Sequence, residues 1–151
     1  MKTVDRLRPW ATILIYALLV LGLFHKVFFP ENSNVYFGWD MLNEYWPDFA
    51  FRFKMLSEGI WPLWNPWDGG GLPYFARSQT MLFYPPSWLL WFFALDEGEL
   101  SIWGIQFFAA WHFLVLATGV HFLSLRIGSG RPGAWLAGTL ILLASHVWAQ
   151  A

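Results

Sequence analysis

Three carboxylates recur at intervals of four residues, at Asp40, Glu44 and Asp48. Four residues advance an α-helix by about 400°, so side chains at this spacing drift by only about 40° per step and form one stripe. Pro47 sets a condition, because a helix with Pro47 in its first turn leaves Asp40 in a preceding turn. Two interpretations stay open. In one, Asp40 faces a membrane surface as a general base or metal ligand, since an apolar boundary raises a carboxyl pKa. In the other, the stripe is a solvated acidic face on which Asp48 and Arg52 form a weak pair.

A second group of residues could bind phosphate. Arg52, Lys54 and Arg77 are the basic residues between positions 31 and 99, and guanidinium groups hold phosphate through charge-assisted hydrogen bonds. The Asp-Gly-Gly-Gly run at residues 68–71 could direct backbone N–H groups at an anion. The three basic residues are alternatively ordinary surface residues. The glycine run is alternatively a simple turn, because no Walker lysine follows it.

The histidine and cysteine content gives weaker indications of a functional site. His112 lies near the middle of an apolar segment, where it is either functional or hydrogen-bonded to a neighbouring helix. His112 and His121 are nine residues apart and would lie on opposite sides of a helix, so we do not expect them to share a metal. The chain has no cysteine, which excludes a disulfide or a thiolate metal site.

The composition indicates what kind of elements must position these residues. The chain has 151 residues, of which 57% are hydrophobic, 21% aromatic and only 13% charged. Soluble domains carry about 25% charged residues. These values disfavour a disordered chain, a basic nucleic-acid binder and a disulfide-stapled secreted domain. They indicate a membrane protein, and the apolar segments described below make the prediction an all-α polytopic one.

A transmembrane helix takes about 20 mostly apolar residues. Three segments qualify, at residues 10–29, 100–125 and 134–151. Lys2, Arg6 and Arg8 lie in a tail over residues 1–9, and no small-x-small cleavage site follows the first segment, so we predict an uncleaved signal anchor. Arg126 and Arg131 lie in the turn over residues 126–133. The positive-inside rule then places both basic clusters in the cytoplasm.

The same rule makes residues 30–99 an external loop. Nine of the ten acidic residues and seven of the twelve tryptophans lie within it. Tryptophan favours the membrane–water boundary, so we expect amphipathic helices on the bilayer surface over residues 40–58 and 87–95. The second of these is about 13 Å long as a helix, under half the hydrocarbon thickness, which favours a re-entrant or interfacial helix over a crossing. Pro85-Pro86 blocks a regular helix before it. The prolines and glycines between the two predict a shaped, turn-rich linker.

Five sequence blocks of this loop occur in an order and spacing that suggest a family. They are Gly38-Trp39-Asp40, Glu44-Tyr45-Trp46-Pro47, Glu58-Gly59-Ile60-Trp61-Pro62-Leu63-Trp64-Asn65-Pro66, Gly70-Gly71-Leu72-Pro73 and Phe83-Tyr84-Pro85-Pro86. In these blocks the chain resembles the YfhO-like bacterial membrane proteins, which belong to the GT-C class of polytopic glycosyltransferases. The resemblance covers residues 38–95, and the flanking apolar segments agree with it in placement.

The resemblance implies transfer of a sugar from a polyprenyl-phosphate donor to an acceptor on the external face of the bacterial cytoplasmic membrane. Asp40 matches the acidic residue of the class and would deprotonate the acceptor hydroxyl or hold a divalent cation, with Glu44 as a second carboxylate. From their side chains we expect four residues to bind substrate: Arg52, Arg77, Trp64 and Tyr84. The implied partners are membrane lipid and the polyprenyl-phosphate-linked sugar, and no nucleic acid is expected.

Three spans are too few to enclose a lipid-linked sugar, because GT-C proteins have many more. We therefore expect this chain to be the N-terminal part of a longer protein, with further helices as partners and with little activity by itself. The alternative is a non-catalytic membrane module, such as a subunit, a lipid-binding scaffold or part of a transporter.

Overall fold

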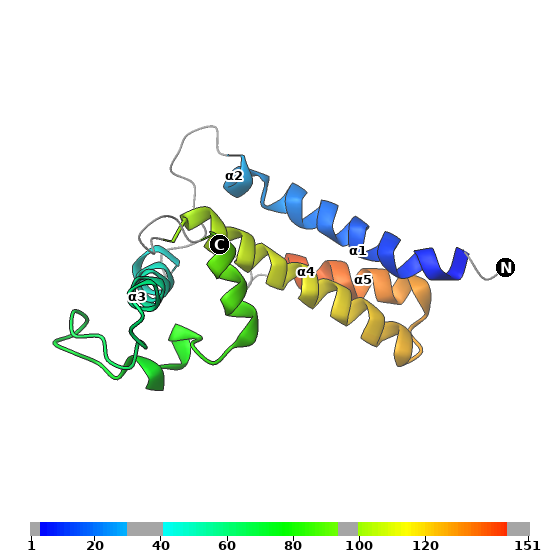
Figure 1. The fold of residues 1–151 in the computed structure, drawn as a ribbon. Helices are drawn as coiled ribbons and strands as arrows, with labels where there is room; N and C mark the ends of the chain where they lie inside the picture. The colour runs from blue at the N-terminus through cyan, green and yellow to red at the C-terminus, as the bar shows by residue number, and fades with distance from the viewer. Residues whose placement is uncertain (1–3, 30–40, 94–99, 145–151) are drawn as a thin grey trace. The chain divides into compact units, whose positions relative to one another are not determined.

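The computed structural model describes residues 4–29, 41–93 and 100–144, and it is mostly helical (Figure 1). Within those ranges there is no β-strand, and the single pair of bridged residues is Asn65 and Leu72. The all-α class predicted from the sequence is thus confirmed for the described residues. The chain divides into two compact units: the helical unit, residues 1–35 and 109–151, and the loop unit, residues 36–108.

The helical unit contains α1 (Val4–Leu23), the short α2 (His25–Phe28), most of α4 (Ile102–Arg126) and α5 (Gly130–Leu143). Among the described residues, α4 is the one helix long and apolar enough to cross a membrane. The apolar part of α1, Pro9–Leu23, is shorter, and α5 has 14 described residues. Crossing by α1 and α5 therefore stays a prediction.

Contacts among α1, α4 and α5 converge on one tyrosine. Tyr16 of α1 is fully buried, and its hydroxyl lies 3.1 Å from Nδ1 of His121 and 3.4 Å from the carbonyl oxygen of Trp135. The rings of His121 and Trp135 meet edge to face, with centroids 4.6 Å apart. Gly138 makes the close approach possible, because a Cβ there would overlap the Tyr16 hydroxyl. His121 is therefore part of the packing that joins the three helices.

The loop unit begins with a π-helical turn, η1 (Met41–Tyr45), which leads directly into α3 (Trp46–Ser57). Pro47 lies in the first turn of α3, where proline is tolerated, so the condition set by Pro47 in the sequence is met. Three 3₁₀ helices follow: η2 (Tyr74–Ala76), η3 (Ser78–Thr80) and η4 (Pro85–Phe93). The turn-rich linker predicted between the helical pieces is therefore present.

The second predicted amphipathic helix differs from expectation in type. Residues 85–93 form the 3₁₀ helix η4, which begins at the Pro85-Pro86 pair and not after it. Proline is tolerated at the start of a helix, so the pair opens this element instead of blocking it. Nine residues at about 2.0 Å per residue span about 18 Å, well short of a bilayer.

Candidate functional site

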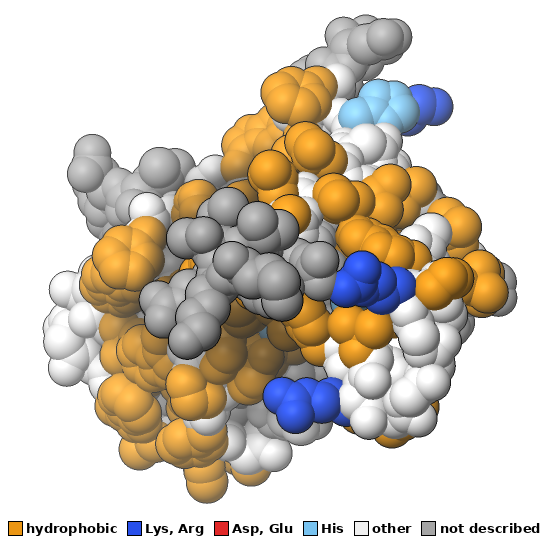
Figure 2. All heavy atoms as spheres, turned by 90° about the vertical axis from the view of Figure 1, so that its right-hand side faces the viewer, with side chains coloured by type: hydrophobic (Ala, Val, Ile, Leu, Met, Phe, Trp, Pro, Cys, Tyr) orange, Lys and Arg blue, Asp and Glu red, His pale blue; other side chains and the backbone are white. Residues whose placement is uncertain are grey.

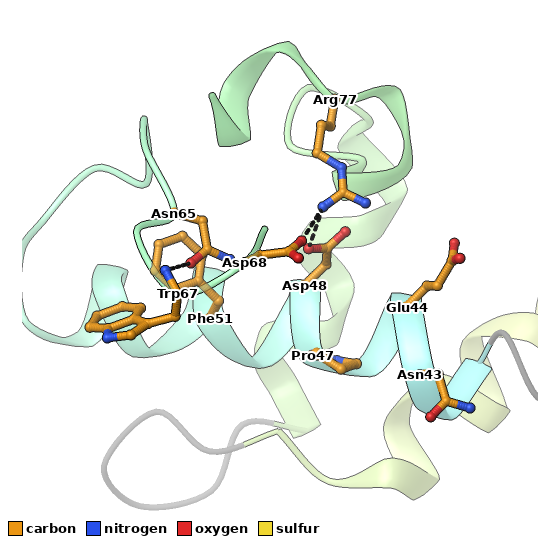
Figure 3. Close-up of a pocket in the computed structure, with 9 residues that line it drawn as sticks. All are labelled: Asn43, Glu44, Pro47, Asp48, Phe51, Asn65, Trp67, Asp68 and Arg77. Atoms are coloured by element: carbon orange, nitrogen blue, oxygen red, sulfur yellow. Dashed lines mark hydrogen bonds and ion pairs between the residues drawn. The ribbon is translucent and has the colours of Figure 1, made fainter. Parts of the chain in front are cut away.

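A cavity of about 540 Å³ lies in the loop unit (Figure 3). It is bordered by η1, the first turns of α3, a turn over residues 65–72 and the segment between η2 and η3. The side chains that line it are mostly polar or charged. They are Asn43, Glu44, Pro47, Asp48, Phe51, Asn65, Trp67, Asp68 and Arg77.

Asp48 is placed by the start of α3. It lies in the first helical turn, where the positive end of the helix dipole favours a carboxylate. The hydroxyl of Tyr74 donates a 2.6 Å hydrogen bond to the Asp48 backbone carbonyl and fixes this turn from the other side. Tyr74 is itself fully buried, so the Asp48 backbone is held within the core of the unit.

Asp68 is placed by a tight turn. Asn65 and Leu72 exchange two backbone hydrogen bonds of 2.9 Å, and the N–H of Gly71 donates to the Asp68 carbonyl at 2.8 Å. Gly71 has φ +111°, which only glycine adopts readily. The geometry matches the simple turn that was one interpretation of residues 68–71, and this turn carries the Asp68 carboxylate to the cavity.

Arg77 connects the two aspartates. In Figure 3 its guanidinium points toward both carboxylates, with Nη1 2.7 Å from Asp68 Oδ2 and 3.6 Å from Asp48 Oδ1. Its Nη2 donates to Gln79 Oε1 at 3.3 Å, and Gln79 Nε2 donates to Glu44 Oε2 at 3.1 Å. The cavity thus contains three carboxylates and one guanidinium, so a neutral or cationic ligand suits it better than a free anion.

Asp48 is the buried acid of this group. It is only 4% exposed, and its Oδ2 has no hydrogen-bond partner within the described parts of the chain. Burial raises the pKa of the Asp48 carboxyl, Arg77 opposes this, and the negative charges of Asp68 and Glu44 add to the increase. A carboxylate with a raised pKa and a free oxygen beside a cavity is suited to accept a proton.

The structure brings some of the predicted site residues together. Glu44 and Arg77 both line the cavity, joined through Gln79. Trp64 is 57% exposed and packs against the same turn, since a Cβ at Gly71 would lie 2.8 Å from its indole ring. Tyr84 is also exposed and follows η3. Asp40 lies outside the described residues.

Arg52 is placed differently. It is fully buried, and its guanidinium donates to Ser87 Oγ at 3.0 Å and to the carbonyl oxygens of Ser87, Met81 and Thr80 at 3.1, 3.3 and 3.5 Å. It also lies 4.7 Å from the centroid of the Phe53 ring. Burial lowers the pKa of Arg52 to about 10.

The ion pair between Asp48 and Arg52, which one interpretation of the sequence predicts, is not formed. Asp48 faces Arg77, while Arg52 points to Ser87 at the start of η4. The difference arises because three backbone carbonyls and a hydroxyl in the core accept hydrogen bonds from the two terminal nitrogens of Arg52, while its Nε has no hydrogen-bond partner within the described residues. Arg52 consequently ties α3 to η3 and η4.

Asp48 and Asp68 line the site, although the sequence alone assigns a catalytic or binding role to neither. The sequence signal for Asp48 is its position in the stripe of carboxylates spaced four residues apart. The sequence signal for Asp68 is its position before three glycines. In the described ranges, no three His, Cys, Asp or Glu side chains are arranged so that they could hold a metal ion. A cation bound by Asp40, outside those ranges, stays a prediction.

No protein-family model matches this chain, and no curated protein or solved structure is significantly similar to it.

Proposed function

We propose that this chain is the N-terminal region of a membrane glycosyltransferase that moves a sugar from a polyprenyl-phosphate donor to an acceptor on the external face. The observation that carries the proposal is Asp48, a buried carboxylate with one unpartnered oxygen at a polar cavity of about 540 Å³. That volume is in the range of sites for small organic ligands. Asn65 and Asp68 offer hydrogen-bonding groups, and Trp67 and Phe51 offer aromatic surface, as a sugar requires.

In the proposed reaction Asp48 is the general base. The acceptor oxygen bonds to the sugar's C1 while the bond from C1 to the phosphate oxygen breaks. The acceptor's proton passes to the Asp48 carboxylate, and polyprenyl phosphate leaves. The transition state carries positive charge on the sugar ring, which the carboxylates of the cavity would stabilise.

The roles of the other residues follow from their contacts. Arg77 holds the carboxylates of Asp48 and Asp68 in place, since it lies between them. Its charge is already balanced, so the donor phosphate would bind elsewhere in the protein. Asp40 is the acidic residue that the family resemblance implies, and its proposed role is to bind a divalent cation.

The proposed topology has three spans with the loop unit outside, lying on the bilayer. Its supports are the length of α4, the basic residues at the two predicted cytoplasmic segments, and the large exposed aromatic side chains of the loop unit. Trp67 is 73% exposed and Phe92 83% exposed. Rings of this kind are accommodated at the membrane–water boundary.

The test uses the full-length protein in its own membranes with a panel of tritiated polyprenyl-phosphate-linked sugars. Asp48→Asn should lower kcat by about 10² to 10⁴, as loss of a general base does. Glu58→Gln is the matched control, because Glu58 is an exposed acid at the end of the same helix. Chromatography would measure movement of label off the polyprenyl phosphate.

Asp40→Asn, made in parallel, separates the two acids. Loss of transfer in Asp40→Asn alone would move the base to Asp40. Wild-type transfer in both variants would contradict a glycosyltransferase site in this loop and favour the non-catalytic module.

A further inference from the structure

The helical unit contains a second cavity, of about 340 Å³. It is bordered by the first half of α1, the last turns of α4 and the first turns of α5. Apolar side chains make up most of the lining, which consists of Pro9, Ala11, Thr12, Ile15, His121, Phe122, Leu125, Arg131 and Trp135. All of these residues belong to the helical unit, so the cavity is a feature of that unit alone.

The cavity is layered from inside to outside. Thr12 and His121 are buried, at 8% and 3% exposed, whereas Ile15 and Leu125 are exposed. Arg131 is also exposed, and within the described residues it makes no ion pair. The site therefore combines an accessible apolar wall with one guanidinium that has no ion-pair partner among the described residues.

The charge around this cavity is positive. Arg126 ends α4 and Arg131 is the second residue of α5. In Figure 2, hydrophobic side chains cover much of the visible face, and Lys and Arg side chains lie among them.

We propose that this cavity binds an anionic phospholipid. One acyl chain packs against Ile15, Phe122 and Leu125, and the phosphate is held by Arg131. An apolar wall beside a basic side chain is the pattern by which basic pockets between membrane helices hold lipid headgroups. The apolar wall distinguishes this ligand from free phosphate, which would need polar partners on every side. The inference does not depend on sugar transfer, because no residue of the loop unit takes part.

The test uses the full-length protein in nanodiscs with spin-labelled phosphatidylglycerol or phosphatidylcholine. Electron paramagnetic resonance measures the fraction of each lipid that is motionally restricted. We expect the wild type to prefer phosphatidylglycerol, and Arg131→Gln to reduce that preference about fivefold, the effect of one basic group at an anionic lipid. Arg131→Lys should keep most of it.

Arg126→Gln is the matched control, because Arg126 is an exposed arginine of the same turn that is not among the cavity-lining residues. It should change the preference much less than Arg131→Gln. Ala11→Phe fills the cavity without changing charge and should lower retention of phosphatidylglycerol. Equal affinity for the two lipids, or equal losses in the two arginine variants, would overturn the proposal. Circular dichroism of each variant shows whether the helices are intact.

Discussion

The two cavities described above differ in the polarity of the side chains that line them. In the loop unit, three carboxylates and one arginine line a polar cavity, and its border combines η1, the start of α3 and two non-helical segments. In the helical unit, mostly apolar side chains line the other together with Thr12, His121 and Arg131, and its border is wholly α-helical. A net charge of −1 conceals this division.

The difference shows what each kind of backbone is used for. Helices present side chains at fixed intervals and pack closely, as Gly138 does against Tyr16. Turns can bring distant residues together, as the pairing of Asp48 with Asp68 through Arg77 demonstrates. Among the described residues, the polar cavity thus needs non-helical segments beside a helix, whereas helices alone border the apolar cavity.

Removing Arg52 should have the largest effect and should be confined to the loop unit. Arg52→Ala leaves the carbonyl acceptors in the core without their donor and removes the packing on Phe53. We expect a loss of about 3 kcal/mol or more in the stability of the unit, as for a buried charged group whose partners are left unsatisfied. Hydrogen exchange followed by mass spectrometry should show faster exchange over residues 41–93.

Lys54→Ala is the control for that experiment, because Lys54 is an exposed cation two residues along α3. It should leave the exchange rates near those of the wild type. Equal effects of the two substitutions would mean that burial of Arg52 does not stabilise the unit.

In the helical unit, the packing of α5 against Tyr16 requires a glycine at position 138. Gly138→Ala places a Cβ against the Tyr16 hydroxyl and 2.9 Å from the Ala117 carbonyl oxygen. Overpacking of this kind costs about 1 to 3 kcal/mol. Gly119→Ala, in open space on α4, should cost nothing. Thermal unfolding in detergent compares the two, and a Gly138→Ala protein as stable as Gly119→Ala would contradict the packing.

The turn that carries Asp68 allows a finer test. Gly71→Ala combines φ +111° with a Cβ 2.8 Å from Trp64, so it should destabilise the turn by about 1 to 3 kcal/mol. Gly69→Ala should cost less, because at φ +58° the residue is in the left-handed helical region and meets Leu72 at an ordinary 3.6 Å. Sugar transfer should fall more in Gly71→Ala than in Gly69→Ala. The reverse order would separate the turn from the site.

Local signals in the sequence predict local structure well here. Pro47 correctly marks the start of α3, and the prolines and glycines mark the turns. The apolar run over residues 100–125 corresponds to a helix, Ile102–Arg126. Local signals do not distinguish a 3₁₀ from an α-helix in a short segment such as η4, since both place apolar side chains on one face.

The site itself depends on contacts that the sequence does not reveal. Asp48 and Arg77 are 29 residues apart, and Tyr16 and His121 are 105 apart, so no spacing rule relates them. Burial of Arg52 runs against the usual exposure of arginine. The stripe from Asp40 to Asp48 drew attention to the correct helix, but only the fold selects Asp48 as the buried acid among the described residues.

The pH dependence of kcat/KM tests the central claim, that the Asp48 carboxylate accepts the proton. Activity should be lost as the pH falls through the raised pKa of Asp48, because the protonated acid cannot act as a base. Arg77→Gln removes the positive charge that lowers this pKa, so the acid midpoint should move to higher pH. Lys54→Gln, an exposed cation on the same helix, should leave it in place. An acid midpoint that is the same in Arg77→Gln and the wild type would contradict the assignment of Asp48 as the base.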